Sequence, residues 1–427
     1  MLNRLPTRVL NHAKGILQET SAQRREERLG ALSVQVPGAE TYDGLDPSSL
    51  ALVGVRASDA TPSAVNLVIP RFRADAVFAG TRTAIEVAVG IGTRLDRPLR
   101  IIVTNSRFTA AHRKDASTYL AREFGLQPDR VTMWSPEDMF EQALGASDLW
   151  LVTHWSTAHA ADVASRMGLL DRSQVVYLVQ DYEPGFTPWS TQHALASSTY
   201  HAGFHFIVNS SPLASYLREH ERLEVPSDQV FRPHLDLDRL AEVASQRVHS
   251  PTTRIMFYGR PSKPRNLFNL GVSALRVAAR TLENDGIAVN IVSAGEAHSA
   301  YQLSKSTVME SSGTLGWGEY YNRLSETDVM LSLQYSPHPS HPPLDAVVSG
   351  ARAVTNEFGG ERNGLSDHLY AGSPDPDSLG QLLVEAVAEA KSAPISSPEL
   401  SVVDRLGVPL SDAVKSVLER VQGPYID

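Results

Sequence analysis

Apolar and polar positions alternate in blocks along most of this 427-residue chain. From Val65 onward, short continuous apolar runs typical of buried strands are followed by longer segments with the 3.6-residue period of helices. The strand-like runs of the first series are 65–70, 99–105, 148–155, 174–181 and 204–210, with helical patterns at 79–95 and 110–125. Continuously apolar strands that alternate with helices predict a parallel sheet covered on both faces.

A second series of the same kind begins near Arg254, after a stretch at 232–253 that is predicted to be a linker. Its strand-like runs are 254–260, 288–296, 329–336 and 352–356, and its helical patterns are 266–282, 320–328, 342–350 and 377–390. The pattern predicts an α/β protein with two doubly wound Rossmann-like domains that face each other across a cleft. We expect an N-terminal helical segment at 1–45, a first domain at 46–240 and a second at 241–427, whose last helix crosses back.

Composition narrows the function classes. The net charge of −9 argues against nucleic-acid binding, and the absence of cysteine excludes disulfides, thiolate catalysis and cysteine-based zinc sites. No apolar run approaches the roughly 20 residues that span a bilayer, and no secretory signal is visible, so a cytoplasmic protein is expected. Residues 1–30 mix apolar side chains with six Arg/Lys. They fit either a frayed helix or an amphipathic helix at the inner face of a membrane.

Ligands of doubly wound sheets bind beyond the carboxyl ends of the strands, so the chemistry is sought there. Neither half has the G-x-G-x-x-G or G-x-x-x-x-G-K-[ST] loops that cradle dinucleotide or NTP phosphates. Instead, Arg260, Lys263 and Arg265 follow the run 254–260 closely, in a loop stiffened by prolines. Guanidinium groups beside a helix N-terminus suit phosphate oxygens, although a solvated basic loop would look the same.

The segment 336–356 predicts a short helix near 342–349, because prolines suit a first turn and Gly350 suits an end. Asp345 is expected in the first turn, where it either offsets the helix dipole or accepts hydrogen bonds from sugar hydroxyls. His338 and His341 stand three residues apart, but a proline separates them and no third ligand of matching spacing is near. A metal site is therefore not predicted.

In the first half, His154 ends one strand-like run, and Asp181 and Glu183 follow the next. A strand-end histidine serves either as a structural group or as a partner for a substrate hydroxyl. The two acids either cap a turn or orient a sugar acceptor, with Phe186 or Trp189 offering an apolar face. Each of the three polar residues is thus a candidate for the chemistry at the strand ends.

Two D-x-D patterns, at 236–238 and 375–377, match a short signature that holds a metal ion in some enzymes. Asp236 lies in the expected linker, and Asp375 lies in a proline-rich loop before a helical pattern. Both aspartates are predicted to be helix caps or turn residues.

The second half resembles the donor domain of GT-B glycosyltransferases of the retaining family-four type. Arg260 matches an arginine that follows a strand-ending glycine in that family, and Arg265 stands where the family has a lysine; both imply diphosphate binding. The family also has two glutamates separated by seven residues. Asp345 falls at the second, which implies a ribose contact, whereas Pro337 replaces the first. Lys263 is out of register with the motif.

The stretches SPHPSHPPL and VQDYEP are together similar to rhamnosyltransferases that assemble bacterial surface glycans from dTDP-L-rhamnose. This resemblance implies that Ser340, Thr355 and Asn356 lie at the donor nucleotide and sugar. It also places His154 where many retaining GT-B enzymes have a histidine near the transferred sugar. Such enzymes generally need no metal or other cofactor beside the nucleotide sugar.

The expected function is therefore transfer of a sugar, L-rhamnose in the narrower resemblance, from a nucleotide diphosphate to a saccharide acceptor, free or lipid-linked. Two alternatives stay open: a nucleotide-sugar epimerase of the same fold, and a two-lobed protein that binds carbohydrate without chemistry. Release of nucleoside diphosphate, with and without an acceptor, separates all three.

Overall fold

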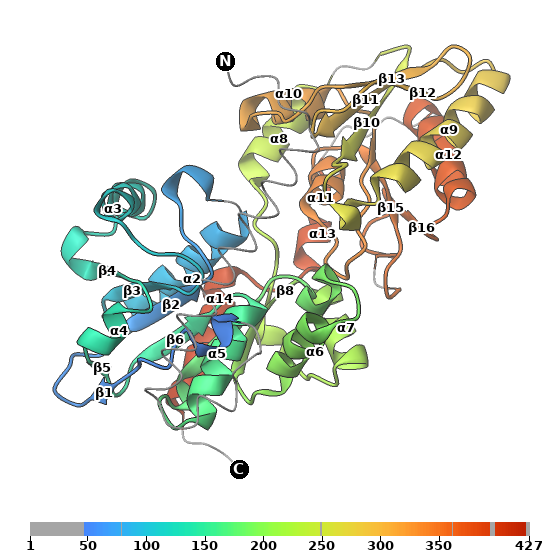
Figure 1. The fold of residues 1–427 in the computed structure, drawn as a ribbon. Coiled ribbons are helices and arrows are strands. Elements are labelled where there is room, and N and C mark those ends of the chain that lie inside the picture. The colour runs from blue at the N-terminus through green and yellow to red at the C-terminus, as the bar shows by residue number, and fades with distance from the viewer. Residues whose placement is uncertain (1–46, 78, 248–249, 361, 393–397, 424–427) are drawn as a thin grey trace, which may run out of the picture. The chain divides into compact units, whose positions relative to one another are not determined.

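A computed structural model describes residues 47–77, 79–247, 250–360, 362–392 and 398–423 (Figure 1). The predicted helical segment at 1–45, with its membrane contact through 1–30, lies outside the described residues. Two seven-stranded sheets and a separate parallel pair, β1 (Ala57–Ser58) with β5 (Leu144–Gly145), make up the β structure of the described chain.

The first sheet has the strand order β4-β3-β2-β6-β7-β8-β9. Strand β2 pairs in parallel with β3 and β6, and all three are buried along their length. In chain order its strands are β2 (Val65–Ile69), β3 (Leu99–Val103), β4 (Val131–Trp134), β6 (Leu149–Val152), β7 (Val175–Val179), β8 (His205–Asn209) and β9 (Val230–Phe231). The accompanying helices are α2 (Ala79–Leu95), α3 (Ala110–Phe124), α4 (Asp138–Glu141), α5 (Trp155–Arg166), α6 (Thr191–Ser198), α7 (Ser211–His220) and α14 (Leu410–Gln422).

The second sheet has the order β12-β13-β11-β10-β14-β15-β16, and only its edge pair β12·β13 is antiparallel among the described strands. Its strands are β10 (Thr253–Gly259), β11 (Val289–Gly295), β12 (Tyr301–Gln302), β13 (Val308–Ser311), β14 (Val329–Leu331), β15 (Arg352–Asn356) and β16 (Leu369–Gly372). Its helices are α8 (Leu237–Ser245), α9 (Phe268–Asn284), α10 (Trp317–Ser325), α11 (His341–Val348), α12 (Pro376–Ser392) and α13 (Ser401–Asp404).

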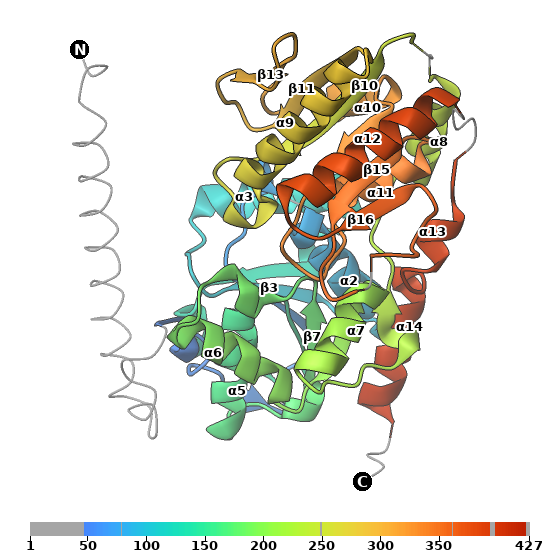
Figure 2. The ribbon, with the colours of Figure 1, turned by 90° about the vertical axis from the view of Figure 1, so that its right-hand side faces the viewer.

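Alternation along the strands builds a core on each face of the second sheet. Ile255 and Phe257 of β10 pack with α9 and α12, which lie side by side in Figure 2. Met256, between them, belongs to the opposite core, formed with α8, α10, α11 and α13. Both faces are thus covered, as expected for continuously apolar strands.

The described chain divides into two compact units. One contains Thr187–Ile207 with the described parts of Met1–Val179 and Val414–Asp427, and the other contains Gln180–Phe186 and Val208–Ala413. Two Rossmann-like domains with parallel sheets confirm the predicted fold class. Acceptor binding by the first and donor binding by the second stay predictions.

The prediction of a linker at 232–253 was wrong for the central part of that stretch, because residues 237–245 form helix α8. Leu240 and Val243 of this helix are buried in the core of the second sheet. Their spacing of three residues is helical, a signal that the linker prediction did not use. No helix in the described ranges combines the length and apolar character that a membrane crossing requires.

Candidate active site

The basic loop after β10 lies at the carboxyl edge of the second sheet, where Gly259 ends the strand. Arg260 lies 3.5 Å from Glu296, which follows the neighbouring strand β11. Glu296 also accepts hydrogen bonds from the backbone N–H and the hydroxyl of Ser262, at 2.9 and 2.6 Å, and these bonds lower its pKa. The carboxylate therefore stays ionised and fixes the loop, while Lys263 is exposed.

Arg265, the last cation of this loop, is paired within the second unit. Its Nη1 donates to Asp181 at 2.7 Å, and its guanidinium lies 4.5 Å from the centre of the Phe186 ring. Arg265 is 41% exposed, whereas Asp181 is 13% exposed, and burial raises the pKa of Asp181. The arrangement is an arginine oriented by a carboxylate and an aromatic face, with part of the cation still facing solvent.

Asp181 and Glu183 lie in the segment 180–186 that groups with the second unit. Asp181 accepts a second hydrogen bond from the hydroxyl of Ser336, in the loop after β14, so it joins that loop to Arg265. Glu183 is buried at the start of a short 3-10 turn. The structure thus brings Asp181 into contact with Arg265, a predicted donor-binding residue.

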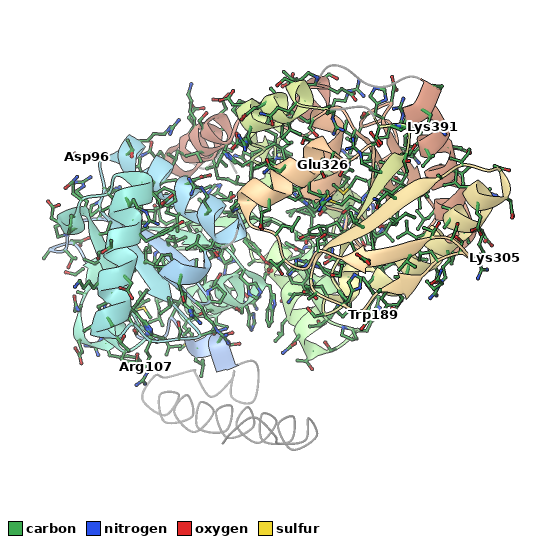
Figure 3. The ribbon with its side chains drawn as sticks, turned by 90° about the horizontal axis from the view of Figure 1, so that it is seen from above. Asp96, Arg107, Trp189, Lys305, Glu326 and Lys391 are labelled. Atoms are coloured by element: carbon green, nitrogen blue, oxygen red, sulfur yellow. The ribbon has the colours of Figure 1, made fainter. Side chains whose placement is uncertain are left out.

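Trp189 and Phe186, the two aromatic candidates, differ in their surroundings. Phe186 lies under the Arg265 guanidinium. Trp189, labelled in Figure 3, is 91% exposed and its ring stacks on His193 at 4.7 Å. Trp189 therefore presents an aromatic face to solvent, whereas the ring of Phe186 is covered by the Arg265 guanidinium.

The loop after β14 is held from behind by Arg362, a fully buried residue that the sequence did not suggest. Its Nη2 donates to the carbonyl oxygens of Gln334, Ser336 and His338, and its Nη1 donates to the carbonyl oxygen of Asn356 and the hydroxyl of Thr355. Burial lowers the pKa of Arg362 to about 10, so it remains a cation at neutral pH. One side chain thereby fixes the path of the whole loop.

Thr355 and Asn356, expected at the donor, have their polar atoms engaged in this scaffold. The Asn356 side chain accepts from the Gln334 N–H at 2.8 Å and donates to the Gln334 carbonyl at 3.0 Å. The amide thus replaces a strand partner, which explains why β14 ends at Leu331 although an apolar run to 336 suggested a longer strand. Their role at the donor stays a prediction.

Helix α11 begins at His341, one residue earlier than the prolines suggested. Ser340 is its N-cap, with φ 70°, and Pro342 and Pro343 follow His341 in the helix. Ser340 caps nothing with its side chain, and its backbone N–H donates instead to Nδ1 of His338 at 3.1 Å. The rings of His338 and His341 stack at 6.0 Å. Burial lowers the pKa of both, to about 4 for His341, so both are neutral.

Asp345 is the fifth residue of α11, so the prediction that it lies in the first turn was wrong. Instead of facing the helix N-terminus, its carboxylate accepts a hydrogen bond from the hydroxyl of Tyr320, on α10, at 2.8 Å. Burial and the nearby Asp236 raise its pKa to about 7, while the Tyr320 bond opposes them. Asp345 is therefore a buried acid whose charge changes near neutral pH.

His154 belongs to the first unit, where it is the N-cap of α5. Its Nδ1 accepts from the N–H of Ser156 at 3.2 Å, and the hydroxyl of Thr157 accepts from the His154 N–H, which completes a capping box. This is the structural role that the sequence left open beside the catalytic one, and its contact with a substrate stays a prediction.

The D-x-D aspartates are caps, as predicted. Asp236 accepts from the Arg239 N–H at the start of α8, and Asp375 accepts from the Ser378 N–H at the start of α12. Within the part of the chain that the structure describes, no three His, Cys, Asp or Glu side chains form a metal-binding group.

The second sheet therefore gathers most of the predicted donor residues at one edge. Loops or helices that follow neighbouring strands carry Arg260, Lys263, Arg265, Ser340 and Asp345. Sequence reasoning missed Arg362, Ser336 and Tyr320, which hold the others in place. Positive φ angles at Gly359, Gly360 and Gly364 mark the turn that returns Arg362 to the sheet edge, and the run of glycines was the available signal.

Comparison with known proteins finds two matching family models: residues 64–210 match "WsaF, N-terminal domain" and residues 253–384 match "WsaF, C-terminal domain". The O-antigen biosynthesis protein RfbC of Myxococcus xanthus is 32% identical over 255 residues. That match covers 59% of this chain and 19% of RfbC, so the chain spans about a fifth of the relative's length.

Solved structures with a similar fold are GT-B glycosyltransferases. HepE of Anabaena, in complex with UDP and glucose, has a TM-score of 0.54 at 11% identity, over 85% of this chain and 100% of that chain. A trehalose-phosphate synthase (UDP-forming) of Burkholderia vietnamiensis has a TM-score of 0.52 at 13% identity, over 84% and 99%. With both halves matched in order, the chain has the GT-B fold and belongs to the WsaF family.

Proposed function

We propose that this protein is a glycosyltransferase of cell-surface polysaccharide or O-antigen synthesis. The observation that carries the proposal is the cluster of cations at the carboxyl edge of the second sheet, in a chain with both domains of the WsaF family. RfbC bears the name of an O-antigen biosynthesis protein, and the similar HepE structures contain UDP, glucose and UDP-glucose. These relatives support a nucleotide sugar as donor and a growing glycan as acceptor.

In the proposed reaction, the bond between the anomeric carbon and the diphosphate oxygen breaks, and its electrons stay with the diphosphate. The acceptor hydroxyl oxygen bonds the anomeric carbon and gives up its proton to a carboxylate, for which Asp181 and Glu183 are the candidates. Arg260 and Arg265 would stabilise the charge that develops on the diphosphate, with Lys263 beside them. In the second unit, Glu296 pairs with Arg260 and Asp181 pairs with Arg265, and the diphosphate would replace these carboxylates.

The narrower part of the proposal is the donor and the placement of its groups. The likeness of SPHPSHPPL and VQDYEP to rhamnosyltransferases supports dTDP-L-rhamnose. Asp345 would accept hydrogen bonds from the ribose, with Ser340, Thr355 and Asn356 around the nucleotide and sugar. His154, Asp181 and Glu183 remain the candidates that orient the sugar and the acceptor. A cytoplasmic location, at the inner face of the membrane, fits a donor made in the cytoplasm.

The test is Arg260→Ala, assayed with dTDP-L-rhamnose and UDP-glucose as donors and a lipid-linked or free saccharide acceptor. Loss of one charge-stabilising group should lower transfer about 10²–10³-fold. Lys305→Ala, at an exposed position of the same unit, is the control and should retain transfer. Unchanged nucleoside diphosphate binding and transfer in Arg260→Ala would contradict the phosphate assignment, and an isomerised donor without diphosphate release would contradict transfer itself.

A further inference from the structure

His338 carries a buried polar atom that the proposed function has not used. The residue is 6% exposed, and its Nε2 has no hydrogen-bond partner among the described residues. A buried donor without a partner costs about 1–3 kcal/mol, so such atoms in native proteins usually have a reason. The backbone of His338 is bonded, since its N–H donates to Ser336 and its carbonyl accepts from Arg362.

The hydrogen bonds of the ring decide what Nε2 offers. Nδ1 of His338 lies 3.1 Å from the backbone N–H of Ser340 and must accept from it, because a backbone N–H is a donor. Burial keeps the imidazole neutral by lowering its pKa well below 6.5. A neutral imidazole that accepts at one nitrogen carries its proton at the other. His338 therefore presents an Nε2–H donor, and its missing partner is an acceptor.

The surroundings of His338 favour an acceptor with negative charge. Arg362, directly behind the loop, is a fully buried cation whose acceptors in the described chain are carbonyl and hydroxyl oxygens rather than carboxylates. Glu357 and Asp181 lie near enough to raise the pKa of Arg362, so its charge is already balanced in part. At His338 itself, the nearby charges of Arg362 and Arg265 are positive and lower the pKa of the ring. An anionic acceptor gains from these charges, whereas a sugar hydroxyl would use the donor alone.

His338 also lies in the right part of the fold. Its loop follows β14, which pairs with β10, and the basic loop with Arg260 and Arg265 follows β10. Parallel neighbours place the two loops at one edge of the sheet, and Asp181 bonds both Ser336 and Arg265. The unpartnered donor and the proposed diphosphate site therefore belong to one structure within the second unit.

We propose that His338 donates its Nε2–H hydrogen bond to an anionic oxygen of the donor diphosphate, with Arg362 positioning the loop that carries it. The inference rests on the proposed function and adds a binding residue to it. It supplies a contact in the place where the related motif has a glutamate, at Pro337, and this chain has none. The neutral imidazole binds the leaving diphosphate oxygen without a change of its own charge.

Two conservative variants separate this role from a structural one. The side-chain oxygen of Asn mimics Nδ1 and keeps the bond from Ser340, but Asn has no donor at the Nε2 position. The side-chain nitrogen of Gln reaches the Nε2 position, but the bond from Ser340 is lost. We expect His338→Asn to weaken binding of dTDP and UDP about tenfold, as for a hydrogen bond to a charged group, and His338→Gln to stay within about threefold of the wild type. Thymidine and uridine, which lack phosphate, should bind all three proteins alike.

The opposite order, with His338→Asn intact and His338→Gln impaired, would show that His338 only caps Ser340 and would overturn the proposal. Arg260→Ala, measured beside them, separates this failure from that of the proposed function. If Arg260→Ala weakens dTDP binding while His338→Asn does not, only His338 is wrong. If Arg260→Ala binds dTDP normally, the diphosphate site itself is wrong.

A measurement on the wild-type chain guards against a variant that fails to fold. In protein labelled with ¹⁵N-histidine, the signal that disappears in His338→Gln identifies the ring of His338. Addition of dTDP should move its Nε2–H proton downfield, because a new acceptor deshields it, and thymidine should leave it unchanged. A proton that stays in place at saturating dTDP would contradict the contact.

Discussion

The loops that follow β10 and β14 hold their positive charge in opposite ways. In the first, Arg260 and Arg265 are partly exposed and each faces a carboxylate, Glu296 or Asp181. The cation at the second loop is Arg362, from the turn after β15, which is fully buried and donates to backbone carbonyl oxygens of the loop. The exposed cations can exchange a carboxylate for a phosphate, whereas the buried cation cannot leave the loop that it supports. The comparison separates two partly exposed cations that are able to bind a ligand from one buried cation that fixes the shape of a loop.

Arg362→Met should have the largest effect, on stability. It would leave several buried carbonyl oxygens without donors, at about 1–3 kcal/mol each, so we expect the free energy of unfolding to fall by about 3 kcal/mol or more. Chemical denaturation measures this change. Arg280→Met, at an exposed position of α9, is the matched control and should stay within about 0.5 kcal/mol. Equal stability of the two variants would show that Arg362 does not hold the loop after β14 in place.

Asp345→Asn should change how stability depends on pH. Because the pKa of Asp345 is raised from 3.8 to about 7, the folded state holds its proton more tightly than the unfolded chain does. Its contribution to stability is thus present at low pH and lost as the pH rises toward 7. Relative to Asp345→Asn, the wild type should lose on the order of 1–3 kcal/mol between pH 5 and pH 8.

Glu296→Gln is the control for this pH dependence. Hydrogen bonds from Ser262 lower the pKa of Glu296, so its contribution is lost only as the pH falls below its normal range near 4.5. Between pH 5 and pH 8 the Glu296→Gln profile should run parallel to the wild type. Thermal unfolding midpoints over this range suffice, and a flat difference between wild type and Asp345→Asn would contradict the raised pKa.

Asp181→Asn, at the junction of the two loops, should have the smallest effect. Asn can still accept from Ser336, but it no longer neutralises Arg265. A partly exposed ion pair is worth about 0.2–1 kcal/mol, so dTDP should bind about two- to fivefold more tightly. Calorimetric titration detects this gain. Weaker binding would mean that Asp181 orients Arg265 for phosphate rather than competing with phosphate for it.

The sequence was most informative where function depends on neighbours along the chain. Strand periodicity placed Arg260 and Arg265 at a strand end, and the D-x-D aspartates were correctly predicted as helix caps from their position before helical patterns. The prolines and Gly350 also located the short helix that carries Asp345, within one residue of its start. These features follow from rules about single elements.

The groups that hold the site together were beyond such rules. Arg362 bonds Gln334, 28 positions earlier, and Tyr320 bonds Asp345, 25 positions later. Periodicity cannot decide whether Tyr320 or its neighbour Tyr321 reaches Asp345, because that depends on how α10 packs against the rest of its core. The segment around Arg362 has the composition of an exposed turn, and only the tertiary fold buries its guanidinium.

The amide of Asn356 gives this architecture a consequence for folding order. The chain at Gln334 has no strand partner of its own there and depends on the end of β15 and on the turn that carries Arg362. Those elements are made later in synthesis than the loop they support. The loop after β14 can therefore take its final shape only after the sheet has formed, and the proposed site matures as one of the last steps of folding.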